Sequence, residues 1–319
     1  MGELLVLNKD DDTVSYLDAD TGETLATVET DFNPHEVALS PDGDTAYVTC
    51  SLGNSLLFLD NESREVRDRF EHELFEFPHG LAVRESAGEL WLASTYSSEI
   101  FVFDLATEEL LETFPTHQQH SHMVTFGADE ETAYVANIGS DSVTIVDADE
   151  RRVAADPPVG AGPEGIAVDP DTGEVLVANQ DDDDLTVLDS EEGTSSGSRT
   201  SSGDGETYEE RSSAMLGTTP VRVVLDPEGR FALVANREGD DVSVVDTEFV
   251  RDGERRPWEV QRIPVGVWPG GTVFEPSGDR AFVANNKTND VSVIETERFE
   301  EVERFDAGIH PDGIAYRSD

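Results

Sequence analysis

Histidine is the residue whose spacing in this chain most clearly indicates chemistry. The chain repeats a motif that starts at an anchor residue, usually proline, and continues through a small apolar run and an acidic turn. The anchors are Pro34, Pro78, Ser121, Pro163, Pro220, Pro269 and Pro311. Five of the seven histidines lie immediately before or after an anchor, where chance would place fewer than one. This concentration predicts that the anchors meet at one functional site.

The residue after each anchor is a polar or small one. Taken in ring order from the terminal repeat, these residues are Asp312, His35, His79, His122, Glu164, Val221 and Gly270. Imidazole and carboxylate groups are preferred ligands of first-row transition metals. We therefore predict a divalent ion such as zinc, manganese, copper or iron, held by the three histidines together with Glu164 and Asp312. Two alternatives stay open: the cluster binds a ligand without a metal, or it is a structural polar cluster.

Three further residues lie beside this predicted arc. His120 and His310 each precede an anchor, and they are candidates for moving a proton. Arg222 lies two positions after the anchor Pro220, next to the small residues of the arc, and its guanidinium could hold a substrate carboxylate. We predict these three as the catalytic groups if the protein is an enzyme.

The repeats themselves predict the elements that position this site. Four of the six intervals between anchors are 42 to 44 residues long, and each repeat contains four short β-strand patterns. A period near this length with four strands per unit is typical of a β-propeller, in which each unit forms one blade. The fold class is therefore all-β, a seven-bladed propeller with four-stranded blades.

The two ends of the chain predict how the ring closes. Residues 4–29 supply the second, third and outer strands of one blade without its inner strand, and the segment 313–317 supplies one inner strand. We expect the C-terminal strand to join the N-terminal blade, so that residues 1–319 form a single domain. Two insertions interrupt the repeats: a disordered Ser/Gly-rich loop at 190–206 and a shorter loop at 247–257.

Charge excludes several classes of partner. The chain has 70 acidic and 21 basic residues and a formal net charge of −49. Such a surface repels nucleic acids and anionic membranes, so we predict neither as a partner. The acids are spread over the loops, which resembles the acidic bias of proteins from extreme halophiles.

No signal peptide or transmembrane pattern is visible, so we expect a cytoplasmic monomer.

Five second-strand segments carry a recognisable signature. They read YVTC, YVAN, VAN, VAN and FVAN, at residues 47–50, 134–137, 177–179, 234–236 and 282–285. These segments, with the turns that precede them, resemble the YVTN repeat of the YncE-like, surface-layer-like seven-bladed propellers. The resemblance covers the whole chain and implies the fold, whereas propellers host unrelated activities. Similar seven-bladed proteins include sugar lactonases, metal-dependent uronate lyases and copper enzymes.

Two functions follow as hypotheses. In the first, the protein is a binding module that holds a transition metal or a small acidic ligand at the top mouth of the central channel and presents it to a small molecule or a protein. In the alternative, it is a metal-dependent lyase or lactonase that acts on a uronate or sugar lactone. The ion would then polarise a carboxylate or ester carbonyl as a Lewis acid.

Overall fold

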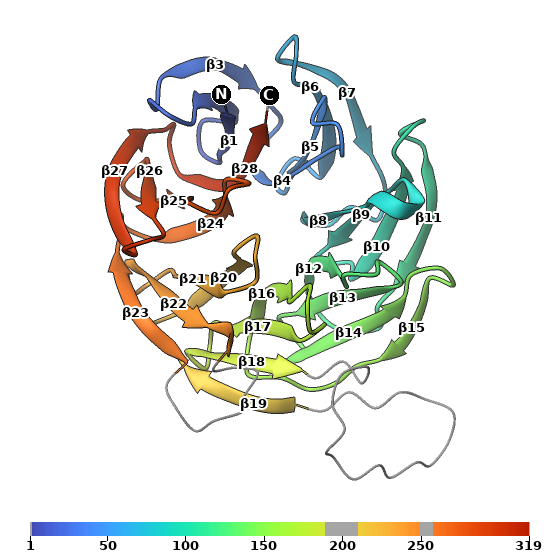
Figure 1. Cartoon of the computed structure of the whole chain (residues 1–319). Coiled ribbons are helices and arrows are strands. Elements are labelled where there is room, and N and C mark those ends of the chain that lie inside the picture. The colour runs from blue at the N-terminus through green and yellow to red at the C-terminus, as the bar shows by residue number, and fades with distance from the viewer. Residues whose placement is uncertain (1, 189–209, 249–257, 319) are drawn as a thin grey trace.

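Seven four-stranded antiparallel sheets are arranged around a central channel in the computed structural model (Figure 1), as the repeats predict. The structure describes residues 2–188, 210–248 and 258–318. The predicted insertion at 190–206 lies outside the described residues, as do residues 249–257 of the second insertion.

Each blade contains an inner, a second, a third and an outer strand. The inner strands, which surround the channel in Figure 1, are β4 (Pro34–Leu39), β8 (Pro78–Arg84), β12 (Ser121–Phe126), β16 (Pro163–Val168), β20 (Pro220–Leu225), β24 (Pro269–Phe274) and β28 (Pro311–Ser318). The second strands are β5 (Thr45–Cys50), β9 (Glu89–Ser94), β13 (Thr132–Asn137), β17 (Val175–Asn179), β21 (Phe231–Asn236), β25 (Arg280–Asn285) and β1 (Gly2–Asn8).

The remaining two strands of each blade lie farther from the channel. The third strands are β6 (Ser55–Asp60), β10 (Glu99–Asp104), β14 (Ser142–Asp147), β18 (Asp184–Leu188), β22 (Asp241–Asp246), β26 (Asp290–Glu295) and β2 (Thr13–Asp18). The outer strands are β7 (Glu65–Glu71), β11 (Leu110–Pro115), β15 (Arg152–Ala155), β19 (Glu210–Met215), β23 (Glu259–Pro264), β27 (Glu300–Asp306) and β3 (Thr24–Glu29). A short 3₁₀ turn, η1 (Glu85–Ala87), connects β8 to β9.

The ring closes as predicted. Strand β28 pairs antiparallel with β1, and the sheet order of this blade is β28-β1-β2-β3. The two termini consequently lie side by side (Figure 1). Closure pairs the edge of β1 that would otherwise be exposed, which removes a site of edge-to-edge aggregation.

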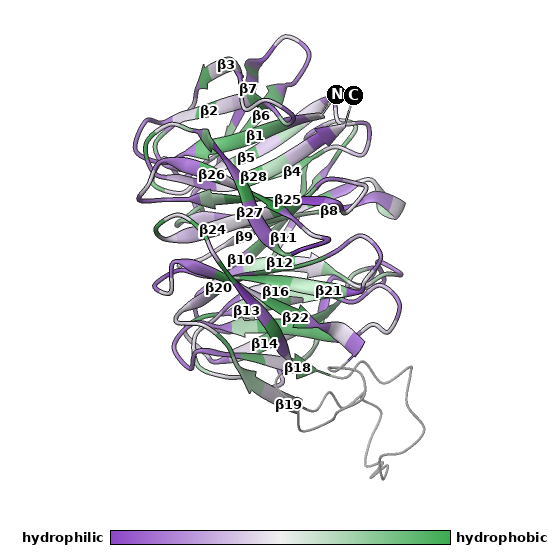
Figure 2. Cartoon of the chain, turned by 60° about the vertical axis from the view of Figure 1, so that its left-hand side comes forward, coloured by the Kyte–Doolittle hydropathy of each residue, from purple (hydrophilic) through white to green (hydrophobic). Residues whose placement is uncertain are grey.

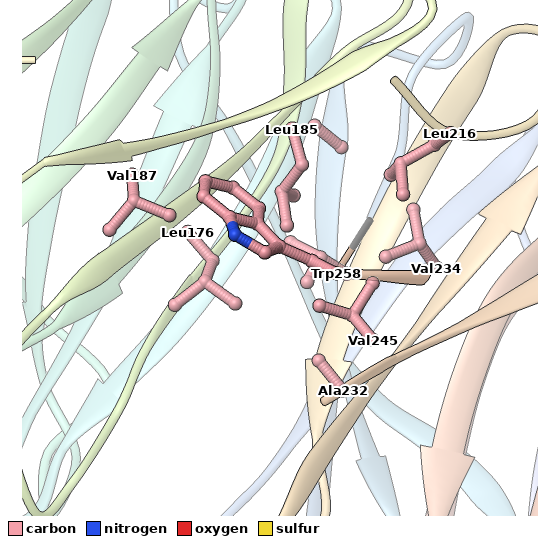
Figure 3. Close-up of a cluster of buried hydrophobic side chains, with 10 residues drawn as sticks. Leu176, Leu185, Val187, Leu216, Ala232, Val234, Val245 and Trp258 are labelled. Carbon is pink, nitrogen blue, oxygen red and sulfur yellow. The ribbon is translucent and has the colours of Figure 1, made fainter. Parts of the chain in front are cut away.

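Apolar side chains pack between neighbouring blades. In one such cluster, Leu176 and Leu185 of one blade face Val234 and Val245 of the next, and the buried Trp258 fills the space between them (Figure 3). The hydropathy colouring shows apolar residues along many of the strands and hydrophilic ones in the loops and turns (Figure 2), while outer strands such as β7 and β27 are largely polar and exposed. Burial of these faces is the dominant favourable contribution to the folded state, so the blades form a rigid support for the loops.

A β-bulge at the start of each inner strand positions the site. In the β4–β5 pair, Pro34 lies opposite Cys50 and Glu36 lies opposite Thr49, so His35 is one extra residue. The same one-residue shift follows the anchor in all seven inner strands. A bulge bends the strand and redirects a side chain. The residue after each anchor therefore turns toward the channel.

Glycine follows the bulged residue in four blades, at Gly80, Gly165, Gly271 and Gly313. A Cβ atom added at Gly271 would lie 2.1 Å from the carbonyl oxygen of Asp312 in the next blade. These glycines let neighbouring inner strands approach each other closely.

Another repeated contact fixes the connections between blades. The residue before each anchor has a positive φ, and its N–H donates to a side chain in the loop between the second and third strands of the preceding blade. The acceptors are Asp12, Asn54, Ser98, Asp141, Asp183, Asp240 and Asn289. The acidic residues of these loops therefore have a structural role, and the loops around the channel mouth are held in place.

No helix in the described ranges has the length and apolar character needed to cross a membrane.

Candidate functional site

A pocket of about 300 Å³ opens at the mouth of the channel on the face that carries these loops. We call it the top pocket. It is lined by Lys9, His35, Phe77, Tyr96, His122, Ile138, Glu164, Gln180, Arg237, Trp268, Pro269, Gly270, Asn286 and Asp312. Its volume is at the lower end of the range for small-molecule sites. The lining combines charged groups, amides and three aromatic rings, which suits a polar ligand with apolar faces.

The structure brings together the three histidines that the bulges direct inward. The ring centroids of His35 and His79 are 4.2 Å apart, and those of His79 and His122 are 3.6 Å apart with the rings stacked. All three are buried. His35 and His122 line the top pocket, whereas His79 lies between them and is not part of its lining.

His35 is held by contacts at both ring nitrogens. The Ser51 hydroxyl, which donates to the carbonyl oxygen of Pro78 at 2.8 Å, lies 3.0 Å from His35 Nδ1. The Nε2 atom lies 3.0 Å from Lys9 Nζ and 3.1 Å from Asp312 Oδ2. Lys9 Nζ also donates to Asp312 Oδ2 at 2.7 Å. His35 is thereby committed to a buried network with a lysine and a carboxylate.

The other two imidazoles are less constrained. His122 Nδ1 lies 3.1 Å from the Thr95 hydroxyl, which fixes the ring and leaves its other nitrogen for the pocket. The Nδ1 atom of His79 is buried and has no hydrogen-bond partner. A buried polar atom without a partner is unfavourable, so it marks a position where a water or ligand group would be stabilised.

The environment keeps the histidines neutral. Burial lowers the pKa of His35, and the adjacent Lys9 lowers it further. The pKa values of His79 and His122 lie well below the ordinary value of 6.5, first because of burial and then because of neighbouring imidazoles and the Arg222 guanidinium. A neutral imidazole at pH 7 can accept a proton, which is the requirement for a general base.

Each carboxylate of the predicted arc has a cation beside it. Glu164 accepts a hydrogen bond from Arg237 at 2.6 Å. Burial acts to raise the pKa of Asp312, but Lys9 and His35 outweigh it and hold the pKa well below its usual range. Both cations face the top pocket, so the negative charges of Glu164 and Asp312 are balanced locally.

Arg222 lies deeper in the channel than its position next to the arc residues predicts. Its guanidinium forms an ion pair with Glu36 across the channel and lies 3.6 Å from the Met123 sulfur. These three residues line a second cavity of about 530 Å³, bounded mainly by the inner strands, which we call the lower cavity. Burial raises the pKa of Glu36, against the effect of Arg222. Arg222 and Glu36 line the lower cavity and are not part of the top pocket's lining.

The two histidines predicted to transfer protons lie outside the lining of the top pocket. His310 Nδ1 is 2.6 Å from Asp10 Oδ2 in an exposed pair. The His120 ring packs edge-on against Tyr96, with centroids 5.3 Å apart. Both precede an anchor with a positive φ, as do Phe77 and Trp268, which line the top pocket.

Sequence reasoning missed Lys9 and Arg237, although a signal for them exists. Both residues directly follow a second strand. The equivalent positions in the other blades are Ser51, Thr95, Ile138, Gln180 and Asn286, all of which either line the top pocket or bind one of its histidines. The position directly after the second strand is therefore a sequence signal for residues of the site.

Most groups of the predicted metal site already have partners in the protein. The rings of His79 and His122 are stacked, with centroids 3.6 Å apart. Lys9 contacts His35 Nε2 and binds Asp312, while Arg237 binds Glu164. Within residues 2–188, 210–248 and 258–318, no group of three or more His, Cys, Asp or Glu residues is placed to hold a metal ion.

Solved structures share this architecture at low sequence identity. Hydrazine synthase from Kuenenia stuttgartiensis is 20% identical, with 90% of each chain covered and a TM-score of 0.74. The periplasmic gluconolactonase of Pseudomonas aeruginosa is 19% identical over 99% of each chain, with a TM-score of 0.77. A putative 6-phosphogluconolactonase from Bacteroides fragilis is 16% identical over 99% of this chain and 98% of its own, with a TM-score of 0.76. At these identities the likeness shows the fold alone.

Family membership rests on a separate finding. No curated protein matches the chain. The sequence profile of the family described as "Lactonase, 7-bladed beta-propeller" matches residues 111–300, which is more than half of the chain. This segment contains His122, Glu164, Arg222 and Arg237. The chain therefore belongs to the seven-bladed β-propeller lactonase family.

Proposed function

We propose that the protein hydrolyses a sugar lactone in the top pocket. The family match favours the lactonase hypothesis over the binding-module hypothesis. The observation that carries the proposal is His122, a neutral imidazole that faces a pocket containing two cations, Lys9 and Arg237. Ester hydrolysis requires a base for the attacking water and positive charge for the developing oxyanion.

The geometry suggests how the reaction would proceed. His122 accepts a proton from a water molecule as the water oxygen attacks the lactone carbonyl carbon. The Arg237 guanidinium and the Lys9 ammonium stabilise the negative charge that develops on the carbonyl oxygen. The bond from the carbonyl carbon to the ring oxygen then breaks, and the His122 imidazolium returns the proton to the leaving alkoxide. The product is the open-chain hydroxy acid.

The rest of the lining suits a sugar ring. Phe77 and Trp268 lie three blades apart, on opposite sides of the mouth, and can pack against the apolar faces of the ring. The Gln180 and Asn286 amides can bind its hydroxyl groups. The Thr95 hydroxyl holds His122 in position.

The test is the rate of lactone hydrolysis, measured by titrating the acid that is released. Wild-type protein should hydrolyse glucono-δ-lactone faster than the uncatalysed background. The His122→Gln variant should lose about 100-fold or more in kcat, because it lacks the proton acceptor. His72→Gln is the matched control, since His72 packs on Phe70 and Phe101 away from the pocket. Equal rates for wild type and His122→Gln would contradict the proposal.

The transition metal predicted from the sequence has no step in this mechanism. It stays a separate prediction, tested by elemental analysis of protein purified without a histidine tag. Stoichiometric metal that is lost in His79→Ala would support it. Activity that a chelator abolishes and added metal restores would require the mechanism to be rebuilt around the ion.

We also propose a narrower family resemblance, a kind of source organism, a cellular location and an oligomeric state for the protein. The YVTN-like segments support a place among the YncE-like propellers, and the net charge of −49 supports an origin in a halophile. We propose a cytoplasmic monomer that acts on a small acidic molecule.

The single cysteine of the chain, Cys50, is buried, and burial raises the pKa of the thiol to about 12. The thiol is therefore protected without a disulfide.

A further inference from the structure

We propose that the lower cavity is a second binding site, which takes a free α-amino acid with an uncharged side chain. The carboxylate of the amino acid binds the Arg222 guanidinium, its ammonium group binds the Glu36 carboxylate, and its side chain lies below them in the channel. The site is distinct from the top pocket, so this inference does not rest on the lactonase proposal.

One buried ion pair lies at the upper end of the lower cavity. The residues two positions after the anchors form a layer of the channel, in which four of the seven are glycine and the side chains are those of Glu36, Met123 and Arg222. Glu36 belongs to β4 and Arg222 to β20, and the two pair across the channel. The other charged residue of the lining, Glu130, lies in the turn between β12 and β13 and accepts a hydrogen bond from the Ser86 N–H at 2.7 Å.

The wall below this pair combines aliphatic side chains with strand edges. The residue three positions after each anchor lines the cavity in all seven blades, and all but Thr272 are aliphatic. The six aliphatic residues are Val37, Leu81, Val124, Ile166, Val223 and Ile314. Each inner strand is also the edge strand of its sheet, so backbone N–H and C=O groups face the channel. Such a wall suits an uncharged side chain, either apolar or an amide.

The ion pair leaves hydrogen-bonding capacity unused. A guanidinium has five N–H donors, and a carboxylate has two acceptor oxygens. Among the described residues, Arg222 donates to one oxygen, Glu36 Oε1, and otherwise contacts the Met123 sulfur, a weak acceptor, at 3.6 Å. The side chains keep 16% and 10% of their surface accessible, for Arg222 and Glu36 respectively, and both line the lower cavity. A ligand in the cavity can therefore reach both charges.

The two charges favour a zwitterion over an ion. A ligand with one charge would place it near a like charge, because an anion at Arg222 also faces Glu36 and a cation at Glu36 also faces Arg222. An α-amino acid carries both charges on neighbouring groups, so each meets its opposite in a charge-assisted hydrogen bond. Its net charge is zero, so a chain with a net charge of −49 does not repel it.

The lower cavity has its own entrance and sufficient volume. Gly127 and Ala128, in the turn that follows β12, line the cavity, and Ala128 is exposed. This turn is at the opposite end of β12 from His122, which lines the top pocket. The volume of about 530 Å³ is within the range for small-molecule sites. An amino acid can therefore enter without passing through the top pocket.

Calorimetry with wild-type protein tests the two head-group contacts. The probes are L-leucine and L-glutamine, which have uncharged side chains of similar size. Each is compared with the analogue that lacks the ammonium group, isocaproate or glutaramate, and with the analogue that lacks the carboxylate, isoamylamine or γ-aminobutyramide. We expect at least one amino acid to bind about tenfold or more tightly than both of its analogues, since each analogue loses a charge-assisted hydrogen bond. An analogue that binds as tightly as its amino acid, or no binding of either amino acid, would overturn the proposal.

Two double variants identify the cavity that is occupied. Glu36→Gln/Arg222→Gln removes both charges of the proposed site, and the affinity for the amino acid should fall about tenfold or more. Glu164→Gln/Arg237→Gln is the matched control, because it makes the same exchange in an ion pair that lines the top pocket. The control should change the affinity less than about twofold, since it touches neither contact. An equal loss in both variants, or a loss in the control alone, would reject the lower cavity as the site.

Unfolding in urea gives a second readout that needs only wild-type protein. A ligand that binds the folded state alone raises the free energy of unfolding. The amino acid should therefore stabilise the protein more than either analogue at the same concentration. This comparison decides the question even if the Glu36→Gln/Arg222→Gln variant does not fold. Equal stabilisation by the amino acid and its analogues would contradict the two head-group contacts.

Discussion

At the scale of single residues, the site depends on imidazoles that stay neutral. Burial disfavours the charged form of His79 and His122, and the Arg222 guanidinium adds a like charge nearby. Because both effects lower the pKa, His122 can accept a proton at a pH where an ordinary histidine is partly protonated. In the proposed mechanism, Arg222 would therefore act on His122 through its charge.

Removing the charge below the pocket should change the pH profile. In Glu36→Gln/Arg222→Gln the two side chains can still bind each other, while the guanidinium charge that lowers the His122 pKa is gone. That pKa should rise toward 6.5. Since the neutral form is active, the acid limb of kcat should move to higher pH, with the plateau near pH 8 unchanged. An acid limb that does not move would contradict this role of Arg222.

The single Arg222→Met variant is a useful contrast. It leaves the buried Glu36 carboxylate without its cation, and breaking a buried pair in this way costs about 3–5 kcal/mol. We expect a lower free energy of unfolding in urea for Arg222→Met than for the double variant. Equal stabilities would show that the pair is not buried as the structure has it.

At the scale of elements, the β-bulge at the start of each inner strand brings the residues after the anchors together around the channel. Because one extra residue follows each anchor, six side chains and Gly270 are placed around the channel, and the sequence has histidine or a carboxylate at five of these seven positions. The glycines that come next let the inner strands pack closely, and Glu36, Met123 and Arg222 occupy the remaining positions of that layer.

A methyl group added at one of these glycines should disturb the packing between neighbouring inner strands. In Gly271→Ala the new Cβ would lie 2.1 Å from the Asp312 carbonyl oxygen, so the backbone of two blades must shift. We expect the free energy of unfolding to fall by about 1–3 kcal/mol. Gly127→Ala is the control, since its Cβ would meet nothing closer than a side-chain oxygen at 3.3 Å. Equal stability of the two variants would refute the close approach.

The sequence predicts this architecture well for physical reasons. Proline anchors and acidic turns recur at a nearly constant interval, and each repeat contains four short strand patterns. The number of blades and the closure of the ring therefore follow from counting the repeats and the strands at the two ends of the chain. Register along the inner strand also predicts that His35, His79 and His122 meet.

Other parts of the site depend on information that a repeat does not contain. Whether three rings stack or converge on one point is decided by rotamers and by partners such as Lys9 and Thr95, which come from other strands. Arg222 is only one residue beyond the bulge, yet that step moves it from the top pocket to the lower cavity. The direction of a side chain at a bulge is not visible in the residue spacing.

At the scale of the whole molecule, charge dominates. Seventy acidic residues on a compact ring repel one another, and the few cations are grouped in ion pairs and at the channel mouth. The Debye length falls from about 10 Å at 0.1 M salt to about 3 Å at 1 M, so salt screens most of this repulsion.

Stability should therefore increase with salt. We expect the free energy of unfolding in urea, an uncharged denaturant, to be higher in 1 M than in 0.1 M potassium chloride. Sucrose at matched osmolality controls for general solute effects, and it should stabilise less. A free energy that is constant or decreases with salt would contradict a halophilic adaptation.

The most direct measurement is a crystal structure of the protein with gluconate, the open-chain product of glucono-δ-lactone hydrolysis. We expect electron density for the sugar acid in the top pocket, with its carboxylate within hydrogen-bond distance of His122 Nε2 and the Arg237 guanidinium. Density confined to the lower cavity beside Arg222 and Glu36 would contradict a lactonase site in the top pocket, as would an empty top pocket in protein that hydrolyses the lactone.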